Sequence, residues 1–513
     1  MPQEESLPLM IRAFKSGGAT AIVDESGPHT YGSLLEASSR VAAGLLDGQL
    51  DLSEARVCAL LPANFHYVAT QWGVWRAGGV IVPLCTTHPL PEIEYAITDS
   101  DSTIVVYHPQ FKEFLNPIKQ REKGRKFITA EELLDSSTIS LPTISQERRA
   151  MILYTSGTTS RPKGVVLTHL NIASQITSLV TAWKWSASDR ILNVLPLHHV
   201  HGIINVLSCA LWSGAECKML PKFDAAKVWE NFVTQDLTLF MAVPTIYRSL
   251  ITYWNETSEQ EKRKMSTACQ KFRLMVSGSA ALPAGILEEW KKISGHTLLE
   301  RYGMTEIGMA LSNPLHGERK PGYVGTPLPG VEIKLVGDDG SEIPPNAGRA
   351  GEVYVKGPSV FSEYWRRPEI TSESFLNGWF KTGDVAVQDE LDGYFRILGR
   401  SSIDIIKTGG YKVSALEIEE VLRTHPVVKE CAVVGVEDEY WGERVCAVLV
   451  LQPNKQVSMQ ELSEWMKKRI AGYKVPKQMQ IIAELPRNSM GKVVKPELKK
   501  MFLPADKKTS NFS

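Results

Sequence analysis

The chain has 513 residues, which is long for one hydrophobic core and predicts more than one domain. Its 57 Lys and Arg residues balance 57 Asp and Glu residues, so the zero formal net charge gives no reason to expect nucleic acid or an anionic membrane as a partner. Hydrophobic residues make up 43% and charged residues 22%, as in soluble globular proteins, and no apolar run is long enough to span a bilayer.

The first 150 residues alternate short apolar runs with helical patterns, which is typical of a parallel sheet covered on both faces. The polar segment 110–147 is expected on the surface. The predicted strands are residues 21–23, 57–61, 78–84 and 103–107, and the predicted helices begin at residue 31 and cover residues 65–75.

A run of hydroxyl, glycine and basic residues, YTSGTTSRPKG at residues 154–164, follows a predicted strand at residues 151–154. Glycine lets the backbone approach an anion closely, and successive N–H groups with Ser and Thr hydroxyls can surround it, so this run predicts a phosphate-binding loop. It is not the loop of P-loop NTPases, because Lys163 is followed by Gly164 and Val165 instead of Ser or Thr and a helix. A solvated Ser/Thr/Gly turn is the alternative interpretation.

The α/β pattern continues with three strand-like runs between residues 191 and 276. From about residue 322, short strands separated by Gly and Pro predict a small β-barrel or antiparallel sheet, and after residue 404 two helical and two strand-like runs predict an α+β domain. We therefore expect an α/β fold of parallel-sheet layers with a small barrel. The expected segments are an N-terminal domain at 1–399, a hinge at 400–404 and a mobile C-terminal domain at 405–513.

The seven cysteines are odd in number, scattered and without a CxxC pair, which fits a reducing compartment and argues against a disulfide framework. Residues 1–6 lack the features of a secretory signal and of a mitochondrial presequence, and residues 510–513 are not a peroxisomal Ser-Lys-Leu signal. We therefore expect the protein in the mitochondrial matrix or the cytoplasm, without a visible cleavable leader.

Further short motifs follow the phosphate loop in order. Read alone, each of them is also compatible with a turn or with a solvated lysine. They are LERYGMTE at residues 299–306, WFKTGD at 379–384, GR at 399–400 and LPRNSMGK at 485–492.

Together these motifs resemble the adenylate-forming superfamily of acyl-CoA synthetases, luciferases and peptide-synthetase adenylation domains, over residues 20 to 500. One departure is Ser160, which stands where the superfamily has glycine. The resemblance implies that a carboxylate and ATP form an acyl-adenylate and pyrophosphate, and that the thiol of CoA then displaces AMP. It further implies Mg²⁺ as cofactor, ATP and CoA as co-substrates, and rotation of the small domain between the two steps.

The resemblance also implies roles for individual residues. Tyr302 would stack on adenine, Thr305 would touch the α-phosphate, and Glu306 would bind Mg²⁺ as a hard carboxylate. Lys492 would neutralise the negative charge that the attacking carboxylate and ATP share, which makes it catalytic together with Thr305 and His199. Asp384 and Arg400 would hold the ribose hydroxyls. The implied ATP- and AMP-binding residues are Thr155, Ser156, Gly157, Thr158, Thr159, Lys163, Tyr302, Thr305, Asp384, Arg400 and Lys492.

The motif KTGGYKVS at residues 407–414 resembles the lining of the superfamily's pantetheine channel, where glycines let a thin thiol arm pass. The superfamily usually has its pivot two positions after the ribose-binding arginine. The spacing here leaves Ser402, Ile403 and Asp404 as candidate pivots. The implied CoA-channel residues are Lys407, Gly409, Gly410 and Tyr411.

Three histidines, His198, His199 and His201, lie within four residues. Such a cluster is compatible with a metal site, but no further set of Cys, His or carboxylate ligands is apparent in the sequence, so we favour an acyl site. The resemblance places His199 beside the acyl carboxylate and His201 on the pocket wall.

Within the superfamily, the sequences around residues 198–202, 273–280, 300–306 and 312–322 look most like those of malonyl-CoA synthetases. Malonate brings a second carboxylate, and a buried unpaired charge is strongly unfavourable, so the pocket needs polar or cationic groups. We favour His201, Ser279 and Arg301 for this contact. The wider candidate set is His201, Ser277, Ser279, Arg273, Arg301 and Arg319.

Several alternatives remain open at this stage. The acid is malonate or methylmalonate in the favoured interpretation, and a short- or medium-chain fatty acid in the next. A stand-alone adenylation domain that loads a carrier protein would share the site, and a non-catalytic binding protein would not need a complete set of site residues. The partners expected are small molecules, namely a dicarboxylic acid, ATP and CoA.

Overall fold

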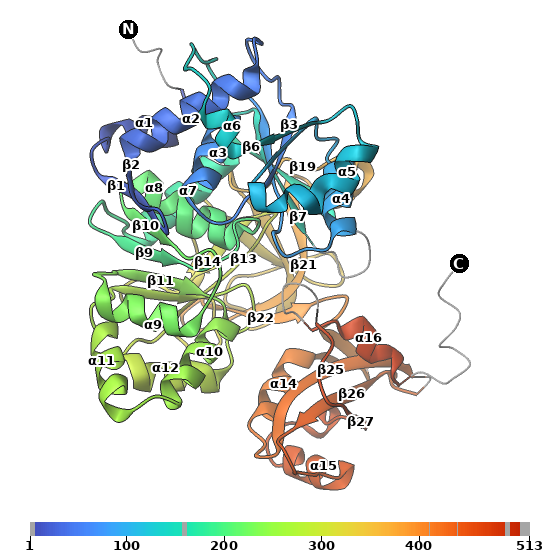
Figure 1. Cartoon of the computed structure of the whole chain (residues 1–513). Coiled ribbons are helices and arrows are strands. Elements are labelled where there is room, and N and C mark those ends of the chain that lie inside the picture. Colours follow the sequence, from blue (N-terminus) through green and yellow to red (C-terminus); the bar gives the residue numbers. More distant parts are fainter. Residues whose placement is uncertain (1–5, 156–161, 410, 439, 488–492, 503–513) are drawn as a thin grey trace. The chain divides into compact units, whose positions relative to one another are not determined.

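The computed structural model describes residues 6–155, 162–409, 411–438, 440–487 and 493–502 (Figure 1). Contacts group the chain into two compact units. Unit 1 comprises Met1–Ile333 and Val355–Phe380, and unit 2 comprises Lys334–Tyr354 and Lys381–Ser513. The strands just before residue 400 therefore group with the C-terminal part, and the hinge expected at residues 400–404 stays a prediction.

The first sheet of unit 1 has nine strands in the order β15-β14-β13-β12-β11-β9-β10-β1-β2. From β9 to β13, neighbouring strands of this sheet run parallel, as the continuous apolar runs predict. The strands are β1 (Thr20–Asp24), β2 (Gly27–Thr30), β9 (Arg190–Asn193), β10 (Glu216–Met219), β11 (Leu239–Ala242), β12 (Leu274–Ser277), β13 (Leu299–Met304), β14 (Gly308–Ser312) and β15 (Thr326–Pro327).

The second sheet of unit 1 has the order β19-β8-β7-β4-β3-β5-β6. Strands β6, β5, β3, β4 and β7 are parallel neighbours, whereas β8 is antiparallel to β7. The phosphate loop predicted from the sequence connects β7 to β8. The strands are β3 (Arg56–Leu60), β4 (Val80–Pro83), β5 (Ile104–Tyr107), β6 (Lys126–Thr129), β7 (Arg149–Thr155), β8 (Lys163–Thr168) and β19 (Glu363–Tyr364).

Segment 110–147 differs from the expectation of a plain surface stretch. It contains two helices and strand β6, which pairs in parallel with β5. Leu115 and Ile118 are buried in the core beside the second sheet, and Leu133 is also buried. The helices expose most of their other residues and one contains Pro117, so the apolar positions are too few to show a clear helical period.

Helices cover the sheets and bury large aromatic side chains. Helices α9 to α12 lie together against the first sheet (Figure 1), where Trp229, Phe232, Phe240, Tyr247 and Trp290 form the centre of the core. The helices of unit 1 are α1 (Pro8–Lys15), α2 (Tyr31–Leu46), α3 (Phe65–Arg76), α4 (Leu90–Asp99), α5 (Lys112–Arg121), α6 (Ala130–Leu134), α7 (His169–Trp183), α8 (Cys209–Ser213), α9 (Ala225–Thr234), α10 (Pro244–Asn255), α11 (Glu259–Cys269), α12 (Ala284–Ser294) and α13 (Pro368–Glu373), with a 3₁₀-helix η1 (Pro109–Phe111) and a π-helix η2 (His201–Ser208).

Unit 2 contains the smaller sheets that the sequence predicts. One has β17, β16, β18 and β21 in order, with β22 antiparallel to β21, and the other has β24, β23, β26 and β25, with β27 parallel to β26. The strands are β16 (Glu332–Val336), β17 (Glu342–Ile343), β18 (Ala350–Lys356), β21 (Trp379–Gln388), β22 (Phe395–Arg400), β23 (Ile405–Thr408), β24 (Tyr411–Ser414), β25 (Val428–Asp438), β26 (Gly442–Leu451) and β27 (Gln478–Ile481), the helices are α14 (Ala415–Arg423), α15 (Met459–Lys467) and α16 (Lys495–Lys500), and β20 (Phe375–Leu376) lies in unit 1.

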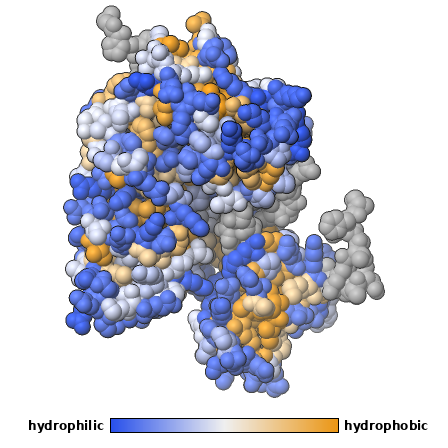
Figure 2. Space-filling view, in the orientation of Figure 1, coloured by the Kyte–Doolittle hydropathy of each residue, from blue (hydrophilic) through white to orange (hydrophobic). Residues whose placement is uncertain are grey.

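The surface is mixed in character. On the face drawn in Figure 2, hydrophobic residues gather on the C-terminal α+β part, whereas hydrophilic residues predominate elsewhere. Among the helices that the structure describes, none combines the length and the apolar character that crossing a bilayer requires.

A buried ionic triad lies in unit 2. Lys495 Nζ, at the start of α16, is 2.6 Å from Asp404 Oδ1 and 2.7 Å from Glu419 Oε1, and the three side chains are 11%, 15% and 4% exposed. Burial lowers the pKa of Lys495, but the two carboxylates outweigh burial and hold the pKa above its ordinary value. The triad therefore ties α16 to α14 and to the turn at residues 400–404.

Replacing Lys495 with alanine should leave two buried carboxylates facing each other. We expect Lys495→Ala to lower the stability of unit 2 by about 3–5 kcal/mol, as for other buried ion pairs that lose one partner. Hydrogen exchange of α14 and β25 in the full chain measures this loss. The control is Lys499→Ala, because Lys499 forms a partly exposed ion pair with Glu443 at 3.6 Å. Loss of this pair should lower the stability of unit 2 by no more than about 1 kcal/mol. Equal effects of the two variants would contradict the prediction.

Candidate active site

Several predicted site residues meet where parallel strands of the first sheet end. His199 and His201 follow β9, Ser279 follows the end of β12, and Arg301 lies in β13. Because β9, β11, β12 and β13 are parallel neighbours, their carboxyl ends share one edge of the sheet, which is the usual place for ligands in open α/β sheets.

The Arg301 guanidinium is buried, with the residue only 5% exposed, and its Nε and Nη2 atoms have no hydrogen-bond partner among the described residues. Burial lowers the pKa of Arg301 to about 9, so the side chain still carries its charge at pH 7. Gly278 faces it closely, since a Cβ atom there would lie 2.5 Å from Arg301 Cζ. A buried cation without a protein counter-charge is unfavourable unless an anion binds beside it.

His201 lies next to this cation. Its Nδ1 atom is 3.2 Å from Ser279 Oγ, and its buried Nε2 atom has no hydrogen-bond partner within the described ranges. Burial, the Arg301 cation and His199 all lower the pKa of His201, so the imidazole is neutral. Ser279 adopts a φ of 69°, a left-handed conformation that non-glycine residues seldom take and that often marks a functional position.

Ser277 and Asn205 are among the buried polar side chains that lack hydrogen-bond partners in the described structure. Ser277 lies at the end of β12, and the amide nitrogen and oxygen of Asn205 are both unpaired. Asn205 lies about one turn after His201 in the π-helix η2, and π-helical turns are frequent at functional sites. Sequence reasoning missed Asn205; its signal was one amide in the otherwise apolar run GIINVL. Buried polar atoms are normally paired, so this group is suited to bind a polar ligand.

The phosphate-loop lysine and the expected magnesium ligand are linked through Tyr364. Lys163 Nζ lies 4.6 Å from the centre of the Tyr364 ring, and the Tyr364 hydroxyl donates to Glu306 Oε1 at 3.0 Å. Tyr364 reaches this place because β19 pairs with β8 beside Val165. Glu306 is buried and offers the hard oxygen ligand that suits Mg²⁺. Tyr364 was also missed, because a lone Tyr in a two-residue strand has no pattern in the sequence.

The two flanks of the phosphate loop are anchored. The Tyr95 hydroxyl donates to the Pro162 carbonyl at 2.7 Å, and the Tyr154 hydroxyl donates to Asp99 Oδ2 at 2.8 Å. Thr155 Oγ1 lies 3.4 Å from the Lys163 carbonyl across the base of the loop. The remaining predicted loop residues, Ser156, Gly157, Thr158 and Thr159, lie outside the described residues.

Tyr302 and Thr305 lie half-buried at the end of β13 and in the turn that follows. Arg301 and Tyr302 are adjacent in β13 and so point to opposite faces of this strand. His198 stands beside His199, with ring centres 4.0 Å apart, and burial, His199 and His88 keep the pKa of His198 well below its ordinary value.

In unit 2, the predicted ribose-binding residues form an ion pair. Arg400 Nε is 3.1 Å from Asp384 Oδ1, and the two residues face each other across β21 and β22. The predicted CoA-channel residues Lys407 and Gly409 lie at the turn of the β23–β24 hairpin, where Tyr411 stacks on Tyr473 with ring centres 4.3 Å apart. Gly410 and Lys492, which complete the predicted sets, lie outside the described residues.

Two arginines that were candidates for the acyl pocket are engaged elsewhere. Arg273 lies before β12, at the opposite edge of the sheet from Ser277, and binds Asp189 with two hydrogen bonds of 2.6 and 2.7 Å. Arg319 donates to the carbonyls of Pro314, Thr297 and Leu315. The structure thus does not bring Arg273 or Arg319 into the group around Arg301.

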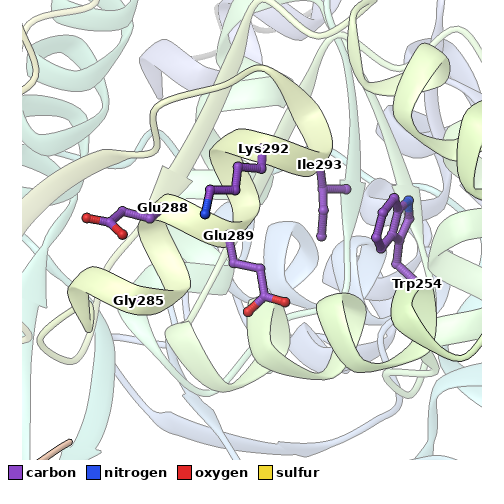
Figure 3. A pocket seen from close by; sticks show the side chains of 6 residues that line it. All are labelled: Trp254, Gly285, Glu288, Glu289, Lys292 and Ile293. Atoms are coloured by element: carbon purple, nitrogen blue, oxygen red, sulfur yellow. The ribbon is translucent and has the colours of Figure 1, made fainter. Parts of the chain in front are cut away.

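A depression of the surface on helices α10 and α12 lies apart from these residues (Figure 3). Carboxylates and an ammonium group project around it from successive turns of α12, so its charges are mixed and it has no convergent set of buried polar atoms. We do not assign the reaction to it. It is lined by Trp254, Gly285, Glu288, Glu289, Lys292 and Ile293.

Comparison with known proteins shows the family of the chain. The AMP-binding enzyme family matches residues 11–365, and the AMP-binding enzyme C-terminal domain matches residues 417–492. The chain therefore belongs to the AMP-binding enzyme family, the adenylate-forming superfamily that its motifs resemble.

Individual relatives are similar over nearly the whole chain. The malonate–CoA ligase ACSF3, mitochondrial, of Mus musculus is 46% identical over 98% of this chain and 92% of its own length. The malonate–CoA ligase of Arabidopsis thaliana is 39% identical over 94% of this chain and 86% of its own length. The crystal structure of ATP-bound MatB from Rhodopseudomonas palustris superposes with a TM-score of 0.88 at 35% identity, covering 97% of this chain and 99% of that one.

Gly278→Ala tests whether Arg301 must lie close to the end of β12. The added methyl group would meet the guanidinium and displace it, so we expect the KM for the acid to rise about 10- to 100-fold while the KM for ATP changes little, on the scale of a lost buried polar contact. The control is Gly285→Ala in α12, where an added Cβ meets nothing within 4 Å. Steady-state kinetics with each substrate varied measure both; unchanged acid binding in Gly278→Ala would contradict the assignment.

Proposed function

We propose that this protein is an ATP-dependent malonate–CoA ligase. The observation that carries the proposal is the buried, charged Arg301 guanidinium, which lacks hydrogen-bond partners on two of its nitrogens among the described residues. Malonate has one carboxylate to react and a second that can pair with this cation. The names of the Mus musculus and Arabidopsis thaliana relatives support the same substrate.

The proposed reaction has two steps. A carboxylate oxygen of malonate attacks the α-phosphorus of ATP, which forms malonyl-AMP and releases pyrophosphate. The sulfur of CoA then attacks the acyl carbon, the thiol proton is lost, and the bond to AMP breaks. Thr305 and Lys163 are proposed to hold phosphates, and His199 to lie beside the reacting carboxylate. Lys492 is proposed to neutralise the charge that builds up as two anions meet in the first step.

Mg²⁺, when bound, supplies positive charge that screens the phosphates of ATP. Glu306 is the residue proposed to hold it, and the Tyr364 hydroxyl orients its carboxylate. Support for the metal comes from MenE of Bacillus subtilis, whose structure in complex with ATP and magnesium ion superposes with a TM-score of 0.83 at 30% identity, covering 96% of this chain and 99% of that one.

Glu306→Gln keeps the shape of the side chain and removes its charge. We expect the adenylation rate to fall and the Mg²⁺ concentration for half-maximal rate to rise, because a neutral amide binds a hard cation less well. Pyrophosphate release across a Mg²⁺ titration measures the shift. Tyr364→Phe is the companion variant, because it keeps the carboxylate charge and should shift the titration less. A Mg²⁺ dependence equal to wild type in Glu306→Gln would contradict the role.

The second carboxylate decides between the candidate acids. A fatty acid of short or medium chain would leave Arg301 buried without an anion, and a site built around a charge discriminates against ligands that lack it. Methylmalonate has the same two carboxylates, so Arg301 does not distinguish it from malonate. An adenylation domain that loads a carrier protein would share the first step with a CoA ligase. Only a CoA ligase should release AMP in a reaction that depends on CoA, so this measurement separates the two kinds of enzyme.

We expect a kcat/KM for malonate over acetate or octanoate of at least ~10²-fold, as for loss of a buried polar contact. Arg301→Met should remove most of this preference while ATP binding persists, because the side chain keeps its length and loses its charge. Arg263→Met, on the exposed surface of α11, is the control for the substitution itself. AMP release with each acid at matched concentration measures the ratio. Faster turnover of octanoate than of malonate would refute the proposed substrate.

We also propose residence in the mitochondrion, which the name of the Mus musculus relative supports. Fractionation of cells that express the protein under its own promoter checks this, and recovery in the soluble cytoplasmic fraction alone would contradict it.

A further inference from the structure

Three metal-ligating side chains come together from two distant segments of unit 1. Cys85 and His88 follow β4, and His198 lies in the loop after β9. The ligand atoms of the three residues, one sulfur and two ring nitrogens, all lie within 4.8 Å of one another. The sequence showed the histidine cluster without further ligands, because Cys85 and His88 are more than a hundred positions away.

His88 is arranged as metal-binding histidines usually are. Its Nδ1 atom is 3.0 Å from Glu92 Oε2, one turn further along in α4, and its buried Nε2 atom has no hydrogen-bond partner among the residues that the structure describes. A carboxylate that binds one ring nitrogen orients the imidazole and leaves the other nitrogen for a metal. The rings of His88 and His198 meet edge to face, with centres 5.8 Å apart.

Cys85 supplies the sulfur. The residue is buried, its thiol is free, and its Sγ atom lies 3.2 Å from Thr87 Oγ1. The backbone turns tightly here, since the His88 N–H donates to the Cys85 carbonyl at 3.3 Å. This turn places both side chains of the C-x-x-H segment on the same side, toward the loop that carries His198.

We propose that Cys85, His88 and His198 form a binding site for Zn²⁺, with a water molecule as the fourth ligand. One thiolate and two imidazoles suit zinc, whereas Mg²⁺ prefers oxygen ligands. Tetrahedral zinc with bonds of about 2.0–2.3 Å separates its ligand atoms by roughly 3.3–3.8 Å, so no two of the three ligand atoms need to approach by more than about 1.5 Å. Thiolate and Glu92 together balance the charge of the ion.

This site is separate from the proposed magnesium site, because Glu306, the proposed magnesium ligand, is not among Cys85, His88 and His198. It connects the segment after β4 to the loop that carries His199, whose ring lies 4.0 Å from that of His198. Bound zinc would therefore position His199 without touching the reacting atoms. The proposal does not rest on the identity of the acid, and its test reads metal binding directly.

The test uses the full-length, untagged protein, freed of metal with a chelator and titrated with Zn²⁺, and in parallel with Co²⁺ as a spectroscopic probe. We expect one zinc ion per chain and, with cobalt, a thiolate-to-cobalt charge-transfer band. Cys85→Ser should abolish the band, and His88→Asn should weaken binding. The controls are Cys269→Ser, a buried cysteine of α11, and His108→Asn, which should bind metal as wild type does.

Glu92→Gln gives the sharper result, because it leaves all three ligands in place. We expect it to weaken zinc binding about 10- to 100-fold, the usual effect of removing a group that orients a metal-binding histidine. Glu92 is half-exposed, so this variant remains informative even if Cys85→Ser fails to fold. Bound zinc should also slow alkylation of Cys85. Two results would overturn the proposal and leave only a reactive thiol. One is zinc binding that is equal in wild type and His88→Asn. The other is alkylation of Cys85 at the same rate with and without zinc.

Discussion

The candidate site depends on one unfavourable feature, the buried Arg301 guanidinium, which has no anionic partner among the residues that the structure describes. Gly278 has no side chain because a Cβ there would collide with Arg301. Ser279 adopts a left-handed backbone and places its hydroxyl against His201. Each of these features alone is unfavourable for the free energy of folding. Each also keeps the space beside Arg301 polar and open. Such local strain persists where a ligand repays it.

Parallel strands bring these residues together. The carboxyl ends of β9, β12 and β13 lie at one edge of the first sheet, so loops that are far apart in sequence meet there. The second sheet repeats the arrangement, since β4 and β7 are parallel neighbours and their ends lead to Cys85 and to the phosphate loop. His198 lies beside His199 and close to Cys85 and His88, so one loop carries residues of both the proposed acyl site and the proposed zinc site.

Much of this could be predicted from the sequence, because strands with continuous apolar runs and motifs of fixed spacing carry local signals. Residues that act through contacts between distant segments could not. Tyr364 reaches Glu306 only through the pairing of β19 with β8, and Cys85 meets His198 only through the order of strands. Arg273 shows the opposite error, since a cation near a strand seemed suited to the acyl pocket, whereas its partner Asp189 lies at the other edge of the sheet.

Separate cations for the two carboxylates of malonate would solve a conflict within the proposed reaction. A carboxylate held tightly by a buried guanidinium is a weaker nucleophile, because the ion pair stabilises the charge that must attack phosphorus. A carboxylate without any cation, however, is repelled by ATP. If Arg301 binds the distal carboxylate, as proposed, the binding energy comes from a group that takes no part in the chemistry, and the reacting carboxylate is left to the cations that are proposed to contact phosphate. Selectivity and reactivity are then set by different residues, so a change at Arg301 should alter which acid is used more than how fast the phosphorus is attacked.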